Sequence, residues 1–192
     1  MNLTKLFEVQ AVLKARIGYK REDKIQKMML AMLVEFMECA NEWQGFKYWK
    51  KNSMPKTSAT SVCGCVMCEH HSVPNDKNPL LEEYVDGLHF VLETGLELIE
   101  NNLIEQLPIN AQAANKIIFL DTTDQFKQIT WVVLKIDAEL SRNDLYQTGR
   151  FYLQLIEEYL LLGKLLGFTE EQIEAAYLEK NKVNHKRQDE NY

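Results

Sequence analysis

Two acidic pairs in this sequence have a spacing that would allow them to bind divalent cations. Glu35 and Glu38 lie three residues apart in "LVEFMECANE", and Glu83 and Asp86 repeat the spacing in "EEYVDGLHF". Residues three apart share one face of a helix. If the two helices pack against each other, four carboxylates converge at one seam. Carboxylates that close repel one another and need cations to stay ionised together.

The chemistry of such a seam suits a nucleoside triphosphate. Hard oxygen ligands favour Mg²⁺, with Mn²⁺ as a substitute, and Mg²⁺ takes phosphate oxygens as further ligands. A metal-activated water can then attack phosphorus. The alternative is that both pairs are solvated helix surface, as acidic residues usually are. Spacing by itself leaves both interpretations open.

The elements that must position these acids are helices. The 192 residues are 46% hydrophobic and 26% charged, with eight glycines and four prolines, and no strand-like alternation is sustained. We therefore predict one all-α domain over residues 1–192, a bundle of about six helices. The predicted helices cover residues 3–17, 22–50, 79–106, 111–140, 144–166 and 169–188. The last begins with a capping box, Thr169 with Gln172.

Apolar stripes run along the two helices that carry the acids, and the acids border these stripes. The stripe of the first comprises Ile25, Met29, Met32, Phe36, Ala40 and Trp43; that of the second comprises Leu81, Val85, Leu88, Leu92, Leu96 and Ile99. Packing through the stripes would bring the acids together. The leucine-rich segment 153–166 is a candidate for a contact between subunits.

A loop insertion is expected at about residues 51–79, where turn-forming residues replace helical periodicity. It contains "CGCVMCEHH", and Cys63, Cys65 and Cys68 could bind zinc with the two histidines. Structural zinc sites usually use ligand pairs separated by a longer span. A reduced, exposed loop that contacts another subunit is the alternative, and zinc binding stays open.

Charge and hydropathy exclude several classes of protein. The net charge of −6 argues against a duplex nucleic-acid binder. The N-terminus lacks the apolar core of a signal peptide, and charged residues interrupt the most apolar segment. We expect a cytoplasmic protein with no membrane partner and no stable nucleic-acid binding.

Cations for a phosphate pocket occur in two segments. Lys47 and Lys50, with Trp49 between them, follow the first acidic helix, and Lys180, Lys182 and Arg187 lie near the C-terminus. Basic residues at a helix end also complement the helix dipole. However, amides are interleaved with the C-terminal cations, and amides offer the donors and acceptors that a nucleobase edge requires.

The combination of "LFEVQ", "LVEFMECANE", "FKYWK", "EEYVDGLHF" and "KNKVNHKRQDENY" resembles the dimeric, all-α dUTPases, relatives of the MazG-like all-α NTP pyrophosphohydrolases. The resemblance implies a homodimer that hydrolyses dUTP, and possibly dUDP, to dUMP with Mg²⁺. It implies that Glu35, Glu38, Glu83 and Asp86 are the metal ligands. Either Glu38 or Glu35 would act on the attacking water, and Glu38 is the preferred choice.

The resemblance also implies a set of residues that bind the substrate. Gln10 would face uracil, Trp49 would pack on the base or sugar, and His89 with Phe90 would line the deoxyribose pocket. Cations and amides would hold the phosphates and orient the nucleotide: Lys47, Lys50, Asn181, Lys182, Asn184 and Arg187.

The predicted function is therefore that of a Mg²⁺-dependent dUTP diphosphatase that keeps uracil out of DNA. One alternative is a related NTP pyrophosphohydrolase with another base preference, such as dCTP. The other is a regulatory interaction protein that uses the cysteine loop.

Overall fold

The computed structural model describes residues 1–62, 72–75, 77–115 and 121–190. Within them the fold is all-α, as predicted, apart from one short strand pair. The elements are α1 (Leu3–Ile17), α2 (Lys24–Trp43), β1 (Ala59–Val62), β2 (Ser72–Asn75), α3 (Pro79–Glu100), α4 (Thr122–Arg142), α5 (Leu145–Leu165) and α6 (Glu170–Asp189).

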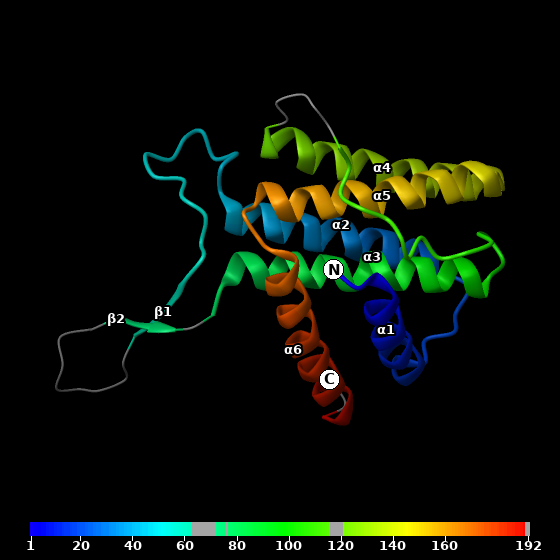
Figure 1. The fold of residues 1–192 in the computed structure, drawn as a ribbon, viewed down its shortest axis with the longest axis horizontal. Helices are drawn as coiled ribbons and strands as arrows, with labels where there is room; N and C mark the ends of the chain where they lie inside the picture. The colour runs from blue at the N-terminus through cyan, green and yellow to red at the C-terminus, as the bar shows by residue number, and fades with distance from the viewer. Residues whose placement is uncertain (63–71, 76, 116–120, 191–192) are drawn as a thin grey trace.

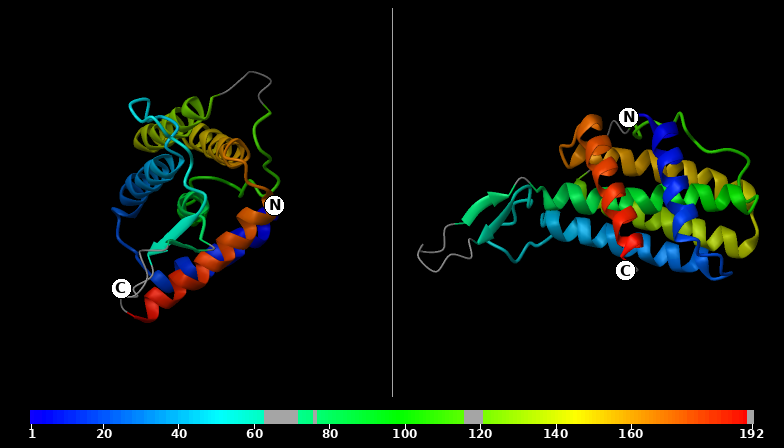
Figure 2. Two further views of the ribbon diagram at one scale, coloured as in Figure 1. Left: turned by 90° about the vertical axis from the view of Figure 1, so that its left-hand side faces the viewer. Right: turned by 90° about the horizontal axis from the view of Figure 1, so that it is seen from below.

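Four long helices form a bundle, and two helices lie across it. In Figure 1 the axes of α2, α3, α4 and α5 run along the long axis of the molecule. Helix α2 packs against α3, and α4 packs against α5. The right view of Figure 2 shows α1 and α6 side by side across the bundle, where both contact α3. The two ends of the chain thus meet on the same helix.

The central helix α3 is buried on more sides than the single predicted apolar stripe implies. Tyr84, Val91 and Leu98 are fully buried, although they lie outside the predicted stripe. Conversely, Leu81 and Leu96 from that stripe are half-buried. The reason is that α3 contacts α1, α2, α5 and α6. A single apolar face is expected for a helix that has a solvent side, and α3 has little of one.

Tyrosine hydroxyls connect α3 to α5 inside the core. Tyr84 donates to the Tyr159 carbonyl at 3.0 Å, and Tyr159 donates to the Tyr84 carbonyl at 2.7 Å. Their rings stack with centroids 4.8 Å apart. Tyr152 donates to the Val91 carbonyl at 3.1 Å. Each buried hydroxyl therefore has a partner, and the two helices are held in one register.

Three predicted helix boundaries were wrong, two of them for reasons visible in the local backbone. The second helix ends at Trp43 because Gln44 adopts a left-handed conformation with φ 62°. The third ends at Glu100, well short of residue 106. The fourth begins at Thr122, where the Asp121 side chain accepts from the Thr123 amide. The capping box of Thr169 with Gln172 is present as predicted.

The connection from α2 to α3 contains a short antiparallel strand pair, in which Ala59 is opposite Asn75 and Val62 opposite Ser72. No strand was predicted in this connection. Cys63, Cys65, Cys68, His70 and His71 lie outside the described residues. Among the described helices, none is both long and apolar enough to cross a membrane.

Two glycines of α3 permit the tyrosine contacts, which leads to a prediction. A Cβ on Gly87 would collide with the Tyr159 hydroxyl, and one on Gly95 with the Tyr152 hydroxyl. Gly87→Ala and Gly95→Ala should each lower the free energy of unfolding by about 1–3 kcal/mol, because the core is overpacked. Urea denaturation followed by circular dichroism measures this.

The control is Gly149→Ala in α5. A Cβ there would meet its nearest neighbour, a methyl of Ile104, at 3.6 Å. Alanine should raise the free energy of unfolding by about 0.5–1 kcal/mol, since glycine is the poorer helix former. Equal effects at all three positions would contradict the tyrosine contacts.

Candidate functional site

Three of the four predicted metal ligands come together on α2 and α3. Carboxylate oxygens of Glu35, Glu38 and Glu83 all lie within 4.8 Å of one another. The two helices run antiparallel in Figure 1, so the first acid of one pair faces the second acid of the other. Glu35 and Glu83 are half-buried, and Glu38 is exposed. Such an oxygen-rich cluster has the donor set that Mg²⁺ or Mn²⁺ prefers.

The fourth acid, Asp86, is held by a cation from α6. Lys180 Nζ donates to Asp86 Oδ2 at 2.5 Å and to Glu82 Oε1 at 3.0 Å. The Lys180 side chain is 10% exposed. This contact attaches the C-terminal helix to the acidic cluster. It also balances part of the negative charge there.

The acidic cluster raises the pKa of its members. Burial, followed by the charges of Asp86 and Glu38, raises the pKa of Glu35 to about 7. Burial and the charges of Asp86, Glu38 and Glu35 raise the pKa of Glu83 to about 7. Without a cation, full ionisation of the cluster is therefore unfavourable at neutral pH. A divalent cation between the acids would remove that penalty.

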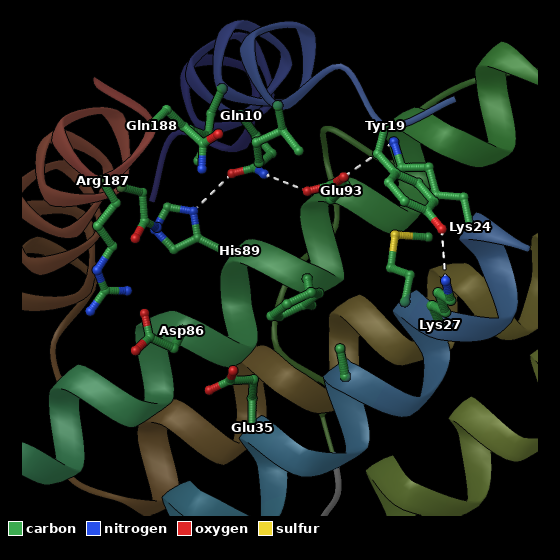
Figure 3. A pocket seen from close by; sticks show the side chains of 16 residues that line it. Gln10, Tyr19, Lys24, Lys27, Glu35, Asp86, His89, Glu93, Arg187 and Gln188 are labelled. Atoms are coloured by element: carbon green, nitrogen blue, oxygen red, sulfur yellow. Dashed lines mark hydrogen bonds and ion pairs between the residues drawn. The ribbon is translucent and has the colours of Figure 1, made fainter. Parts of the chain in front are cut away.

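A pocket of about 470 Å³ adjoins the cluster, between α1, α2, α3 and α6. Figure 3 shows Glu35 and Asp86 at one end and Tyr19, Lys24 and Lys27 at the other. Its size is in the range of pockets for small molecules. The lining mixes apolar and polar side chains: Gln10, Leu13, Ile17, Tyr19, Lys24, Lys27, Met28, Ala31, Glu35, Asp86, His89, Phe90, Glu93, Asn184, Arg187 and Gln188.

Polar side chains from α1, α3 and α6 form one network along the wall of this pocket. Gln10 Oε1 accepts from the Tyr177 hydroxyl at 2.6 Å and lies 2.8 Å from His89 Nδ1. Gln10 Nε2 donates to Glu93 at 3.1 Å. Lys24 lies 3.3 Å from the other oxygen of Glu93. The network joins α1, α6 and the start of α2 to the central helix.

The structure brings only part of the predicted substrate-binding set to this pocket. Gln10, His89, Phe90, Asn184 and Arg187 line it. Asn181, which is 6% exposed, lies on α6 one turn from Tyr177 and is not part of the lining.

The other predicted residues lie away from this pocket. Lys182 pairs with Glu179 on the exposed side of α6. Lys47 donates to the Asn41 carbonyl and Lys50 to Gln44 Oε1, beyond the end of α2. Trp49 is 62% exposed in the same segment. Lys182 points away from the acidic cluster because it lies about 200° around the axis of α6 from Lys180, which contacts that cluster.

Sequence reasoning missed several residues of the pocket. Tyr19, Lys24 and Lys27 come from the turn after α1 and the start of α2, where no motif marks them. Lys180 was among the predicted cations of the C-terminal helix; it contacts Asp86 and Glu82 and is not part of the pocket lining.

A comparison with known protein families identifies one that covers most of the chain. The chain matches the family described as dUTPase over residues 2–62 and 69–192. The residues between these two stretches include Cys63, Cys65 and Cys68. No curated protein matches the chain.

The burial of His89 leads to a prediction about pH. Burial, with the charge of Lys180 as a smaller cause, lowers the pKa of His89 to about 3. An imidazole in the unfolded chain has a pKa near 6.5. Between these values the unfolded chain binds a proton that folded His89 does not, so falling pH should destabilise the protein, by up to about 1.4 kcal/mol per pH unit from this group.

The His89 ring should therefore not titrate in NMR spectra between pH 5 and 8, with His89→Gln used to assign its signals. Above pH 7.5 the contribution of His89 to the pH dependence of unfolding should vanish. A midpoint near 6.5 for this ring would refute the prediction.

Proposed function

The chain belongs to the dUTPase family, and on that premise we propose that it is a dUTP diphosphatase that releases dUMP and pyrophosphate with Mg²⁺ at the acidic cluster. The observation that carries the proposal is the position of three clustered carboxylates beside a pocket that can take a nucleoside. dUDP is a possible second substrate by the same chemistry. The physiological consequence would be the exclusion of uracil from DNA.

Glu35, Glu38 and Glu83 would hold the metal, with Asp86 as the fourth acid. The fit rests on their geometry and on the unfavourable charge of the cluster without a cation. When bound, Mg²⁺ supplies Lewis-acid chemistry that neutralises phosphate charge and makes water more acidic. Mn²⁺ has the same preference for oxygen ligands and is the expected substitute.

The position of each remaining side chain suggests its role in the reaction. Glu38 is the exposed member of the cluster, so it can reach a water that attacks phosphorus and take up its proton. Glu35 occupies the boundary between the cluster and the pocket. Arg187 lines the same wall and can offset the charge of the phosphates. Cleavage between the first and second phosphates then releases pyrophosphate.

The nucleoside would extend along α3 away from the acids. His89 lies one turn beyond Asp86, and Phe90 follows it in the lining. We assign the deoxyribose to these two side chains, where a close fit would exclude a 2′-hydroxyl. The uracil would lie further in, near Gln10, with Asn184 orienting the nucleotide from α6.

A homodimer is part of the proposal, and one apolar face is suited to it. Leu30, Val34 and Met37 on α2 are 65%, 46% and 44% exposed, and their spacing puts them on one side of the helix. Trp131 and Leu134 on α4 line a groove together with Met37. The face lies outside the pocket lining. A second copy of the chain packed there would cover this apolar surface.

The segment 153–166 does not offer such a face. Leu155, Ile156, Tyr159 and Leu162 are buried in the core of the subunit. Leu153 and Leu165 at its ends are 40% and 37% exposed. The leucines of this segment serve mainly the contacts of α5 with α3 and α4.

Removal of the charge of Glu38 or Asp86 should abolish most of the activity. We expect Glu38→Gln and Asp86→Asn to lower kcat for dUTP by about 100-fold or more, because each removes a carboxylate from the reacting centre. Pyrophosphate release at saturating Mg²⁺ measures turnover, and thermal unfolding measures stability. A fully active Asp86→Asn enzyme would refute its role.

Glu82→Gln is the matched control, because Glu82 shares the partner Lys180 with Asp86 but does not belong to the acidic cluster. Its turnover should stay within a few-fold of the unaltered chain. The same assay with dCTP and dTTP tests the substrate: neither should be hydrolysed appreciably. Preference for dCTP would assign the chain a different base specificity.

A charge on the apolar face should dissociate the dimer. Val34→Glu should give a monomer in sedimentation equilibrium, since the carboxylate would be buried without a partner. Val183→Glu is the control, because Val183 is similarly exposed, at 41%, but lies on α6. A Val34→Glu protein that remains dimeric would locate the interface elsewhere.

A further inference from the structure

The buried network on the pocket wall has a fixed direction, which starts at Glu93. An ionised carboxylate accepts hydrogen bonds and does not donate them. Glu93 Oε2 lies 3.1 Å from Gln10 Nε2, and Glu93 Oε1 faces the Lys24 ammonium at 3.3 Å. Both oxygens of Glu93 thus face a cation or a hydrogen-bond donor. Glu93 therefore requires the NH₂ group of Gln10 on its side, and this fixes the orientation of the Gln10 amide.

The orientation of Gln10 in turn decides which nitrogen of His89 carries the proton. Gln10 is 1% exposed, and its Oε1 can only accept. It takes one hydrogen bond from the Tyr177 hydroxyl at 2.6 Å, and the atom at 2.8 Å on its other side is His89 Nδ1. That nitrogen must therefore bear a hydrogen. Because burial keeps the ring neutral, Nε2 is left with a lone pair.

His89 Nε2 is a buried acceptor that lacks a hydrogen-bond partner within the part of the chain that the structure describes. The residue is 6% exposed and lines the pocket. Its ring stacks on Tyr177 with centroids 4.0 Å apart, which fixes the ring plane. Figure 3 shows the ring between Gln10 and Asp86. An orphaned buried acceptor is costly, so a donor from a ligand would bind there favourably.

We propose that Glu93 is a positioning residue that, through Gln10, sets His89 Nε2 as the acceptor for the 3′-hydroxyl of the substrate's sugar. The sugar is the nearest part of a nucleotide to its first phosphate, and His89 lies one helical turn from Asp86 at the acidic end of the pocket. The assignment of the sugar rests on the proposed nucleotide site. The assignment of the tautomer rests on the hydrogen bonds and on the burial of the ring, and does not depend on the proposed substrate.

The tautomer is tested by long-range ¹H–¹⁵N NMR of the histidine rings in the full chain, with His89→Gln for assignment. The unaltered protein should show a protonated Nδ1 and a bare Nε2. Glu93→Gln should give a mixture of tautomers. The glutamine that replaces Glu93 can either donate to or accept from Gln10, so it no longer fixes the orientation of the Gln10 amide. Glu100→Gln is the matched control: Glu100 lies on the same helix and pairs with Lys14, away from Gln10.

The role of the tautomer is tested by binding of dUMP and of its 3′-deoxy analogue, measured by calorimetry without catalysis. The unaltered protein and Glu100→Gln should bind dUMP about tenfold or more tightly than the analogue. In Glu93→Gln this ratio should fall to about threefold or less. If Glu93→Gln fails to fold, Gln10→Leu removes the oxygen that accepts from His89 Nδ1 and should move the proton to Nε2.

A Glu93→Gln protein that keeps both the tautomer and the affinity ratio would overturn the proposal. If the unaltered protein binds dUMP and its 3′-deoxy analogue equally well, or does not bind dUMP, the assignment of the sugar is overturned. The NMR result then still decides the role of Glu93. Failure of the proposed function would appear separately, as normal dUMP binding without hydrolysis of dUTP.

Discussion

The site depends on the antiparallel packing of α2 against α3, which holds like charges together. Glu35, Glu38 and Glu83 would separate if each helix were free, because their carboxylates repel. The apolar side chains beneath them prevent this: Phe36 from α2 and Leu88 from α3 belong to one buried core. The unfavourable charge is thus compensated by hydrophobic burial. The raised pKa values of Glu35 and Glu83 reflect the same burial and charge repulsion.

The central position of α3 explains why the two ends of the chain complete the site. This helix carries Glu83, Asp86, His89 and Glu93 along one side, and α1 and α6 lie across that side. Gln10 reaches it from α1, and Lys180 reaches it from α6 through Asp86. Residues far apart in the sequence therefore share hydrogen bonds. Their side chains form the walls of a pocket that α2 and α3 could not enclose by themselves.

The local signals in the sequence were sufficient for the helices and for the acidic pairs. Helical spacing predicted the six helices of the described residues, and three of the four acids of the i, i+3 pairs on α2 and α3 meet in the structure. The predicted end of α2 was wrong because a single residue decides where the helix stops. Gln44 ends α2 through a left-handed backbone conformation, which helical periodicity does not report. For the same reason Lys47, Trp49 and Lys50 lie beyond the helix and outside the pocket.

The sequence by itself determined the all-α class, the resemblance to dUTPases and the two acidic pairs, because each depends on residues close together in the chain. The tertiary structure decided which face of α6 meets α3, so that Lys180 and not Lys182 reaches the acids. It also decided that Gln10 contacts Glu93, His89 and Tyr177. Such contacts join helices that are distant in sequence, and their geometry follows from how whole helices pack, which no local pattern encodes.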